Sequence, residues 1–415
     1  MKQSSQPEMI RLLLNENKIT DIKKDVLPKI FSKKESNKAR HFHMSFDNYK
    51  ATPLYSLDNL AKNLKVKKIF VKDESNRFDL PAFKVLGGAY AITRLICDKI
   101  GKDIEEVDFN WIREHAAEAI GNVPFITATD GNHGRGIAWA AKQLGQKAIV
   151  YLPKNSAKRR VEAIRETGAE AIVTDLNYDD TVLLAIEKAK EIGGYLVQDT
   201  AWEGYTDVPT WIMQGYTTMG LEVIDQMALL GYERPTHVFL QAGVGGMAAA
   251  MLGLFTNVYK EKLPKAIIVE PNAANCIYKS AEAGDGKPHN VEGDLKTIMV
   301  GLACGVPSPI AWPILRDFSE MFITCDDSLA ARGVRIFANP LADDPKVVSG
   351  ESGAAGIGAF SIIMGLDDLE EVREVLGLDE NSVVLFFNTE GDTDPVNYGE
   401  IIWNGKYRMP MKNND

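Results

Sequence analysis

The sequence has few cysteines, and their spacing is not that of a zinc site. The 415 residues include four cysteines, at positions 97, 276, 304 and 325, and no two of them form a Cys-x-x-Cys pair. Structural zinc is therefore not expected, and neither is any other bound metal. We expect buried free thiols. A bridge between Cys276 and Cys304 is an alternative that would need an oxidising setting or a special role.

The chain also lacks a long apolar run and an excess of positive charge. No stretch reaches the length of a transmembrane helix, and the N-terminus leads into charged residues rather than the apolar core of a signal peptide. Acidic residues outnumber basic ones, 57 to 47, for a formal net charge of −10. This balance disfavours partners such as nucleic acids and membranes. We therefore expect a cytoplasmic protein.

An alternation of predicted strands and helices is what the sequence does contain. The length allows about two domains, and neither an internal repeat nor a low-complexity linker is evident. The alternation predicts an α/β fold with parallel sheets and helices on their faces. The predicted strands are 68–71, 124–129, 148–152, 171–173, 195–197, 237–241, 266–269 and 383–387, and the predicted helices include 89–98, 134–144, 161–166 and 181–192.

One lysine lies among apolar residues where a strand gives way to a helix. Lys84 follows a polar, proline-marked stretch and stands between Phe83 and Val85. Apolar surroundings desolvate a lysine, which lowers the pKa of its amine and makes the amine nucleophilic. Such a lysine can form a Schiff base with an aldehyde. A surface lysine at the start of a helix is the ordinary alternative.

A glycine-rich turn, Gly243–Gly246, follows the strand at 237–241 and opens a helix. Glycines let successive N–H groups converge on one anion, and the helix dipole favours negative charge there. The turn therefore predicts a phosphate site. It is not a Walker loop, and it matches the dinucleotide fingerprint only in part, with weak support from Glu270 one strand later. A tight turn without a ligand is the alternative.

A second strand-to-helix turn contains five candidate residues, Thr129, Asp130, Gly131, Asn132 and His133. Its N–H groups can hold a small carboxylate, and Asn132 can donate a hydrogen bond to a ring hydroxyl. His133 can be interpreted as a base, but packing or support of neighbouring groups is favoured because no nucleophile lies nearby in the sequence. Asp130 would repel a carboxylate, which predicts a ligand that also carries a cation.

Further polar residues follow strand ends. Asp199 comes after the strand that ends at Val197, where open α/β sheets place their sites. A helix N-cap is the alternative for this residue. Thr389 offers a hydroxyl after the last strand, and Glu351 lies in a glycine-bracketed segment. Each of these residues alone is compatible with an ordinary loop.

Together, and in this order, the motifs resemble the fold-type II enzymes that use pyridoxal 5′-phosphate, the group of threonine dehydratase and cysteine synthase. The sequence is more similar to the diaminopropionate ammonia-lyase family, through the segments 39–46, 83–88, 129–136, 198–205 and 389–394. The resemblance implies a tryptophan synthase β-like fold of two three-layer α/β domains with the cofactor in the cleft between them. The larger domain would comprise residues 1–89 and 205–415, and the smaller one 90–204. It also implies a homodimer.

The same resemblance implies a role for each site residue. Lys84 would hold the cofactor beside Phe83, Asn132 would face the ring O3′, and Thr389 would face the pyridine nitrogen. The phosphate would be bound by Gly243, Val244, Gly245 and Gly246. The substrate would be bound by Thr129, Asp130, Gly131 and His133.

The activity that the resemblance implies is α,β-elimination of 2,3-diaminopropionate to pyruvate and ammonia. Freed Lys84 would serve the L-isomer, and Asp199 would serve the D-isomer from the opposite face. Asp130 would pair with the substrate β-ammonium, since threonine dehydratases usually have a small hydroxyl residue there. A neutral hydroxyl at the pyridine nitrogen makes a weaker electron sink, which suits elimination. The alternatives are a threonine or serine dehydratase of the same fold and a non-catalytic pyridoxal-phosphate carrier.

Overall fold

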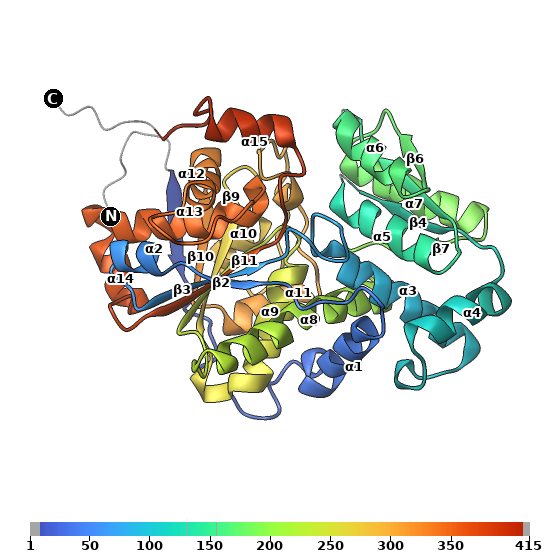
Figure 1. Cartoon of the computed structure of the whole chain (residues 1–415), viewed down its shortest axis with the longest axis horizontal. Coiled ribbons are helices and arrows are strands. Elements are labelled where there is room, and N and C mark those ends of the chain that lie inside the picture. The colour runs from blue at the N-terminus through green and yellow to red at the C-terminus, as the bar shows by residue number, and fades with distance from the viewer. Residues whose placement is uncertain (1–8, 130, 155, 410–415) are drawn as a thin grey trace. The chain divides into compact units, whose positions relative to one another are not determined.

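The chain forms two compact units (Figure 1). The computed structural model describes residues 9–129, 131–154 and 156–409. Described residues of Met1–Val26, Pro53–Ser75 and Val223–Asp415 form the first unit, and those of Leu27–Thr52 and Asn76–Glu222 form the second. The predicted domains are a cofactor-binding domain of residues 1–89 and 205–415 and a substrate-loop domain of residues 90–204. This division stays a prediction. Among the described residues, no helix combines the length and apolar character needed to cross a bilayer.

The first unit is built on a sheet with strand order β1-β10-β9-β8-β11-β3-β2. The central strands β10, β9, β8, β11 and β3 pair in parallel, as the alternation predicted, whereas β1 and β2 pair antiparallel at the edges. The bounds are β1 Ile10–Leu14, β2 Leu54–Ser56, β3 Lys68–Asp73, β8 His237–Gln241, β9 Lys265–Pro271, β10 Met321–Cys325 and β11 Val383–Asn388.

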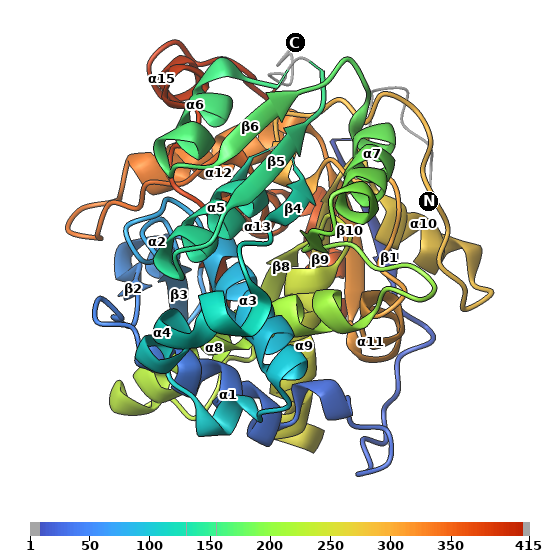
Figure 2. The ribbon, with the colours of Figure 1, turned by 90° about the vertical axis from the view of Figure 1, so that its right-hand side faces the viewer.

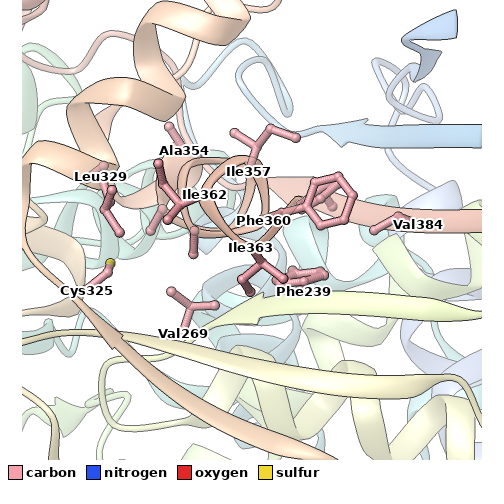
Figure 3. Close-up of a cluster of buried hydrophobic side chains, with 14 of the residues drawn as sticks. Phe239, Val269, Cys325, Leu329, Ala354, Ile357, Phe360, Ile362, Ile363 and Val384 are labelled. Carbon is pink, nitrogen blue, oxygen red and sulfur yellow. The ribbon is translucent and has the colours of Figure 1, made fainter. Parts of the chain in front are cut away.

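Helix α13 (Glu351–Gly365) lies in the hydrophobic core of the first unit. It is apolar around nearly all of its surface and is therefore buried. Figure 3 shows Phe360 and Ile363 of this helix beside Phe239 of β8. A Cβ on Gly333 of α12 (Asp327–Ala338) would overlap the Ala354 carbonyl oxygen, so this glycine lets the two helices approach closely. The remaining helices of the unit are α2 Asp58–Asn63, α9 Gly246–Tyr259, α10 Cys276–Ala283, α11 Ala311–Phe318, α14 Glu370–Leu376 and α15 Pro395–Ile402.

The second unit is built on a parallel sheet with strand order β6-β5-β4-β7 (Figure 2). This arrangement confirms the predicted βαβ pattern between residues 124 and 197. Helices α5 and α7 pack on the strands, and α6 packs on β6. The bounds are β4 Phe125–Ala128, β5 Ala148–Leu152, β6 Glu170–Val173, β7 Tyr195–Leu196, α4 Phe109–Ile120, α5 Asn132–Gln143, α6 Lys158–Glu166 and α7 Tyr178–Glu191.

Helix α3 (Lys84–Ile100) begins at the lysine that the sequence singled out and packs against α5 and α1 (Lys33–Met44). Its glycines permit this packing. A Cβ on Gly88 would lie 2.9 Å from Ile137 Cδ1 of α5, and a Cβ on Gly136 would lie 3.0 Å from the Val85 Cα. The segment of α8 (Asp207–Leu229) up to Glu222 completes the unit.

Candidate active site

The amine of Lys84 forms an ion pair with a carboxylate 115 residues later in the sequence. Lys84 Nζ lies 2.6 Å from Asp199 Oδ2, and the two side chains are only 23% and 14% exposed. Lys84 Nζ also lies 5.6 Å from the centre of the Phe83 ring and 5.9 Å from that of Tyr216, where ring faces attract a cation. Asp199 therefore contacts the lysine rather than capping α8, which begins eight residues later at Asp207.

A histidine completes this cluster. His133 is 4% exposed, and its Nδ1 lies 3.7 Å from Asp199 Oδ2. Its Nε2 lies 2.9 Å from the Val197 carbonyl oxygen, so Nε2–H donates to that carbonyl. The structure thus brings Lys84, His133 and Asp199 together within the second unit. The predicted contact of His133 with substrate stays a prediction.

The charge state of Asp199 follows from these neighbours. Burial alone would raise the pKa of its carboxyl, but the positive charges of His133 and Lys84 outweigh burial and lower the pKa to about 2. Asp199 is consequently ionised at every pH at which the protein would work. A permanent carboxylate beside an amine stabilises the ammonium form of Lys84.

The turn after β4 is organised by one hydroxyl. Thr129 is buried, and its Oγ1 accepts hydrogen bonds from the N–H groups of Gly131 and Gly134 at 3.0 and 3.2 Å. Asn132 is the first residue of α5. The bonds made by Thr129 hold the start of this helix next to its strand. Asp130 lies outside the described residues, so its predicted role stays a prediction.

The glycine-rich turn connects β8 to α9 in the first unit. Gly245 precedes the helix with a φ of +94°, a conformation that favours glycine, and no side chain caps the helix. A Cβ on Gly243 would lie 3.2 Å from Cys304 Sγ and 3.3 Å from the Gly301 carbonyl oxygen. The turn therefore requires glycine for its backbone shape and for its packing, and it ends at the N-terminus of a 14-residue helix.

Thr389 follows β11 and is held by a glutamine of the neighbouring strand. Gln241 Nε2 donates to Thr389 Oγ1 at 3.0 Å and to the Phe387 carbonyl oxygen at 2.8 Å. Because the Thr389 oxygen accepts this bond, its own O–H is directed elsewhere and can donate. No role was predicted for Gln241, although its position as the last residue of the predicted strand 237–241 was an available signal.

Two further predicted features have structural roles in the first unit. Glu270 accepts the N–H groups of Ile277 and Tyr278 at 2.9 and 2.7 Å, and so it caps α10. This use explains the acid without a dinucleotide. The cysteines are free thiols, and Cys276 Sγ lies 3.6 Å from the Gly243 carbonyl oxygen.

Tyr216 is a neighbour of Lys84 that no sequence motif predicted. Its ring centre lies 4.6 Å from that of Phe83, and its side chain is 2% exposed. Burial is the main cause that raises the pKa of its hydroxyl. A tyrosine inside the apolar part of a long helix is usually a core residue, so the sequence around it carried no signal of this position.

The chain is similar to known proteins over nearly its whole length. The family model described as pyridoxal-phosphate dependent enzyme matches residues 46–386. Diaminopropionate ammonia-lyase of Escherichia coli is 52% identical over 381 residues, which cover 92% of this chain and 94% of that protein. The enzyme of the same name from Salmonella typhimurium is 49% identical over 88% of this chain and 91% of its own length.

A solved structure leads to the same relatives. The holo diaminopropionate ammonia lyase of Escherichia coli superposes with a TM-score of 0.89 at 50% identity, covering 97% of this chain and 98% of that one. Another structure of that enzyme, in complex with an aminoacrylate-PLP azomethine reaction intermediate, has a TM-score of 0.87. These findings confirm the resemblance and the fold-type II class. The chain belongs to the diaminopropionate ammonia-lyase family of pyridoxal-phosphate-dependent enzymes.

Proposed function

We propose that the protein eliminates ammonia from 2,3-diaminopropionate, from the D-isomer as well as the L-isomer, with pyridoxal 5′-phosphate as cofactor. The observation that best supports this proposal is the Lys84–Asp199 ion pair at the start of α3, in a chain of this family. With one water, each diaminopropionate yields pyruvate and two molecules of ammonia. The β-nitrogen leaves as the first ammonia, and hydrolysis releases the α-nitrogen as the second.

The residues present fit the cofactor at three points. Lys84 supplies a largely buried amine for the aldehyde carbon. The turn at Gly243–Gly246 supplies the uncapped N-terminus of α9 for the phosphate. Thr389 supplies a neutral hydroxyl for the pyridine nitrogen, while Gln241 fills the acceptor position on its oxygen. Asn132 is proposed to donate to the ring O3′.

The chain itself would orient the substrate and move its protons. Bound pyridoxal phosphate supplies an electron sink for the electrons left at the α-carbon. The Lys84 amine, once released by the substrate amine, takes the α-proton of the L-isomer. Asp199 balances the charge that Lys84 then carries. Asp199 is also proposed as the base for the D-isomer.

Asp130 is proposed to set the substrate preference, because a carboxylate attracts the β-ammonium of diaminopropionate and offers nothing comparable to a neutral hydroxyl. We expect kcat/KM for diaminopropionate to exceed that for serine or threonine by about 100-fold or more. Asp130→Ser should lower the value for diaminopropionate and raise the ratio in favour of serine. Wild-type protein that prefers threonine would instead be a threonine dehydratase.

The proposal also includes the assembly of the protein and its location. The protein is proposed to act as a homodimer in the cytoplasm, by analogy with the family that its motifs resemble. Light scattering of the purified, cofactor-loaded protein tests the assembly, and a monomeric mass that persists at micromolar concentration would contradict it. Pyruvate production by the same preparation excludes a non-catalytic carrier.

A further inference from the structure

A buried histidine holds the first turn of the helix that carries Lys84. His43 lies near the end of α1, and its side chain is completely buried. His43 Nε2 lies 2.9 Å from the carbonyl oxygen of Leu86, two residues after Lys84. His43 Nδ1 lies 2.8 Å from Thr218 Oγ1 of α8. All four residues belong to the second unit.

These contacts define which nitrogen carries the proton. A carbonyl oxygen only accepts, so Nε2–H donates to Leu86, and Nδ1 of the neutral ring accepts from the Thr218 hydroxyl. Burial is the main cause that lowers the pKa of His43, to about 3; Arg77 adds to the lowering, and the Leu86 bond and Glu222 oppose it. The ring is therefore neutral at working pH, and both of its nitrogens are bonded.

The turn that His43 contacts is weak on its own. The residue before the helix, Phe83, provides no side-chain cap, and Gly87 and Gly88 favour the helix less than other residues do. The first of these glycines is required, because a Cβ on Gly87 would lie 2.5 Å from Tyr216 Cε1. The turn thus depends on contacts from other elements for its position.

We infer that His43 is a positioning residue for Lys84. The hydrogen bond from His43 to the Leu86 carbonyl holds the first turn of α3. The position of this turn sets the direction in which the Lys84 amine points. His43 acts through the backbone, at one remove from the reacting atoms. The inference rests on the proposed function, in which Lys84 holds the cofactor and moves the α-proton.

A second histidine in the chain provides a matched control. His237, at the start of β8, is 3% exposed, and burial lowers its pKa as well. Its Nε2 lies 2.8 Å from the Leu376 carbonyl oxygen, and its Nδ1 lies 2.8 Å from Thr236 Oγ1. Like His43, His237 contacts one carbonyl oxygen and one threonine hydroxyl, although the Thr236 hydroxyl also has the Val383 carbonyl oxygen as a partner at 3.1 Å. The carbonyl that His237 holds ends α14, which carries no proposed site residue.

The test compares His43→Phe with His237→Phe, because phenylalanine keeps a ring and removes both bonds. We expect similar losses in Tm. Only His43→Phe should speed hydrogen exchange, by about tenfold and in the cofactor-free protein as well, at the amides of residues 88–91, which bond to the carbonyls of the first turn of α3. Only His43→Phe should move the midpoint pH of the visible absorbance of lysine-bound cofactor. It should also lower kcat by about tenfold with little change in KM.

A conservative variant separates positioning from bulk packing. In His43→Gln the amide N–H can take the place of Nε2–H, so exchange and the absorbance midpoint should return toward wild type. If His43→Phe does not fold, Thr218→Val, which removes only the partner of Nδ1, should shift both readouts in the same direction.

The inference is overturned if His43→Phe and His237→Phe give the same exchange in the α3 turn and the same absorbance midpoint as wild type. A wild-type protein without any absorbance from lysine-bound cofactor would instead overturn the proposed function. The exchange measurement on cofactor-free protein would still decide whether His43 holds the turn.

Discussion

Three largely buried carboxyl groups, one in the second unit and two in the first, have pKa shifts of opposite direction. In the second unit, Asp199 faces Lys84 and His133, and its pKa falls to about 2. In the first unit, Glu270 accepts two backbone N–H groups, and burial raises its pKa to about 8. Burial, with help from the negative charge of Glu390, raises the pKa of Glu351 to about 7. Cationic neighbours therefore decide the charge state, since all three acids are buried.

The difference separates two kinds of site residue. Where proton transfer is proposed, the second unit places an ionised carboxylate beside an amine. The first unit holds its proposed cofactor residues with a glycine backbone and a neutral Gln241–Thr389 bond. Changes of charge in the second unit should therefore alter the reaction. Changes of backbone or burial in the first unit should alter cofactor retention and stability.

The largest effect is expected for Lys84→Ala. Alanine has no amine to hold the aldehyde carbon or to take the α-proton, so activity should fall by more than about 10⁴-fold. The visible absorbance of lysine-bound cofactor should disappear, which spectroscopy of the purified variant measures directly. Persistence of that absorbance would exclude Lys84 as the anchor.

Asp199→Asn should have the next largest effect. The amide keeps the size of the side chain but removes the charge that faces Lys84, and we expect a loss of about 10²-fold to 10⁴-fold in kcat/KM. The loss should be larger for the D-isomer, for which Asp199 is proposed as the base. Separate assays of the two isomers measure this, and equal losses would contradict the division of roles.

Glu351→Gln tests the raised pKa of a buried carboxyl group in the first unit. Because the folded protein holds the Glu351 proton more tightly than the unfolded chain, this group lowers stability as pH rises from about 4.5 to about 7. Glutamine does not ionise, so the variant does not lose stability in this way as pH rises. The free energy of unfolding of the variant minus that of wild type should therefore increase by about 1 kcal/mol or more between pH 5 and pH 8. Denaturant unfolding at both pH values checks this. A difference that does not change with pH would show that Glu351 titrates normally.

Among the variants at proposed site residues, Gly245→Ala should change kcat least. The φ of +94° strains any L-residue, and the added Cβ would lie 3.0 Å from Leu315 Cδ1. We expect a loss of about 1–3 kcal/mol in stability and weaker cofactor binding, with nearly normal kcat at saturating cofactor. Gly399→Ala is a suitable control, because its Cβ would meet nothing within 4 Å. Equal cofactor affinity in both variants would contradict a phosphate role for this turn.

Local patterns were sufficient to predict the parallel sheets. The strand at 237–241 was predicted at its observed bounds, because an apolar run ends in a glycine turn that starts a helix. The edge strand β1 was missed. Its partner is β10, where Ile10 lies opposite Cys325, and such a long-range pairing leaves no mark on the short segment itself.

The site was predictable residue by residue but not as a set of contacts. Lys84 stood out at the start of a helix and Asp199 at the end of a strand, whereas their 2.6 Å contact depends on the packing of the second unit. His43 carried no separate signal, because a histidine on the buried face of a helix is ordinarily a core residue. Its carbonyl partner belongs to the backbone, which no side-chain motif records.

The most direct test of the proposed function is the product ratio of purified, cofactor-loaded protein supplied with D- or L-2,3-diaminopropionate. We predict a yellow protein that forms pyruvate from either isomer, with two molecules of ammonia for each pyruvate. A colourless protein that does not take up pyridoxal phosphate, or a yellow one that forms no pyruvate from either isomer, would contradict the proposed function.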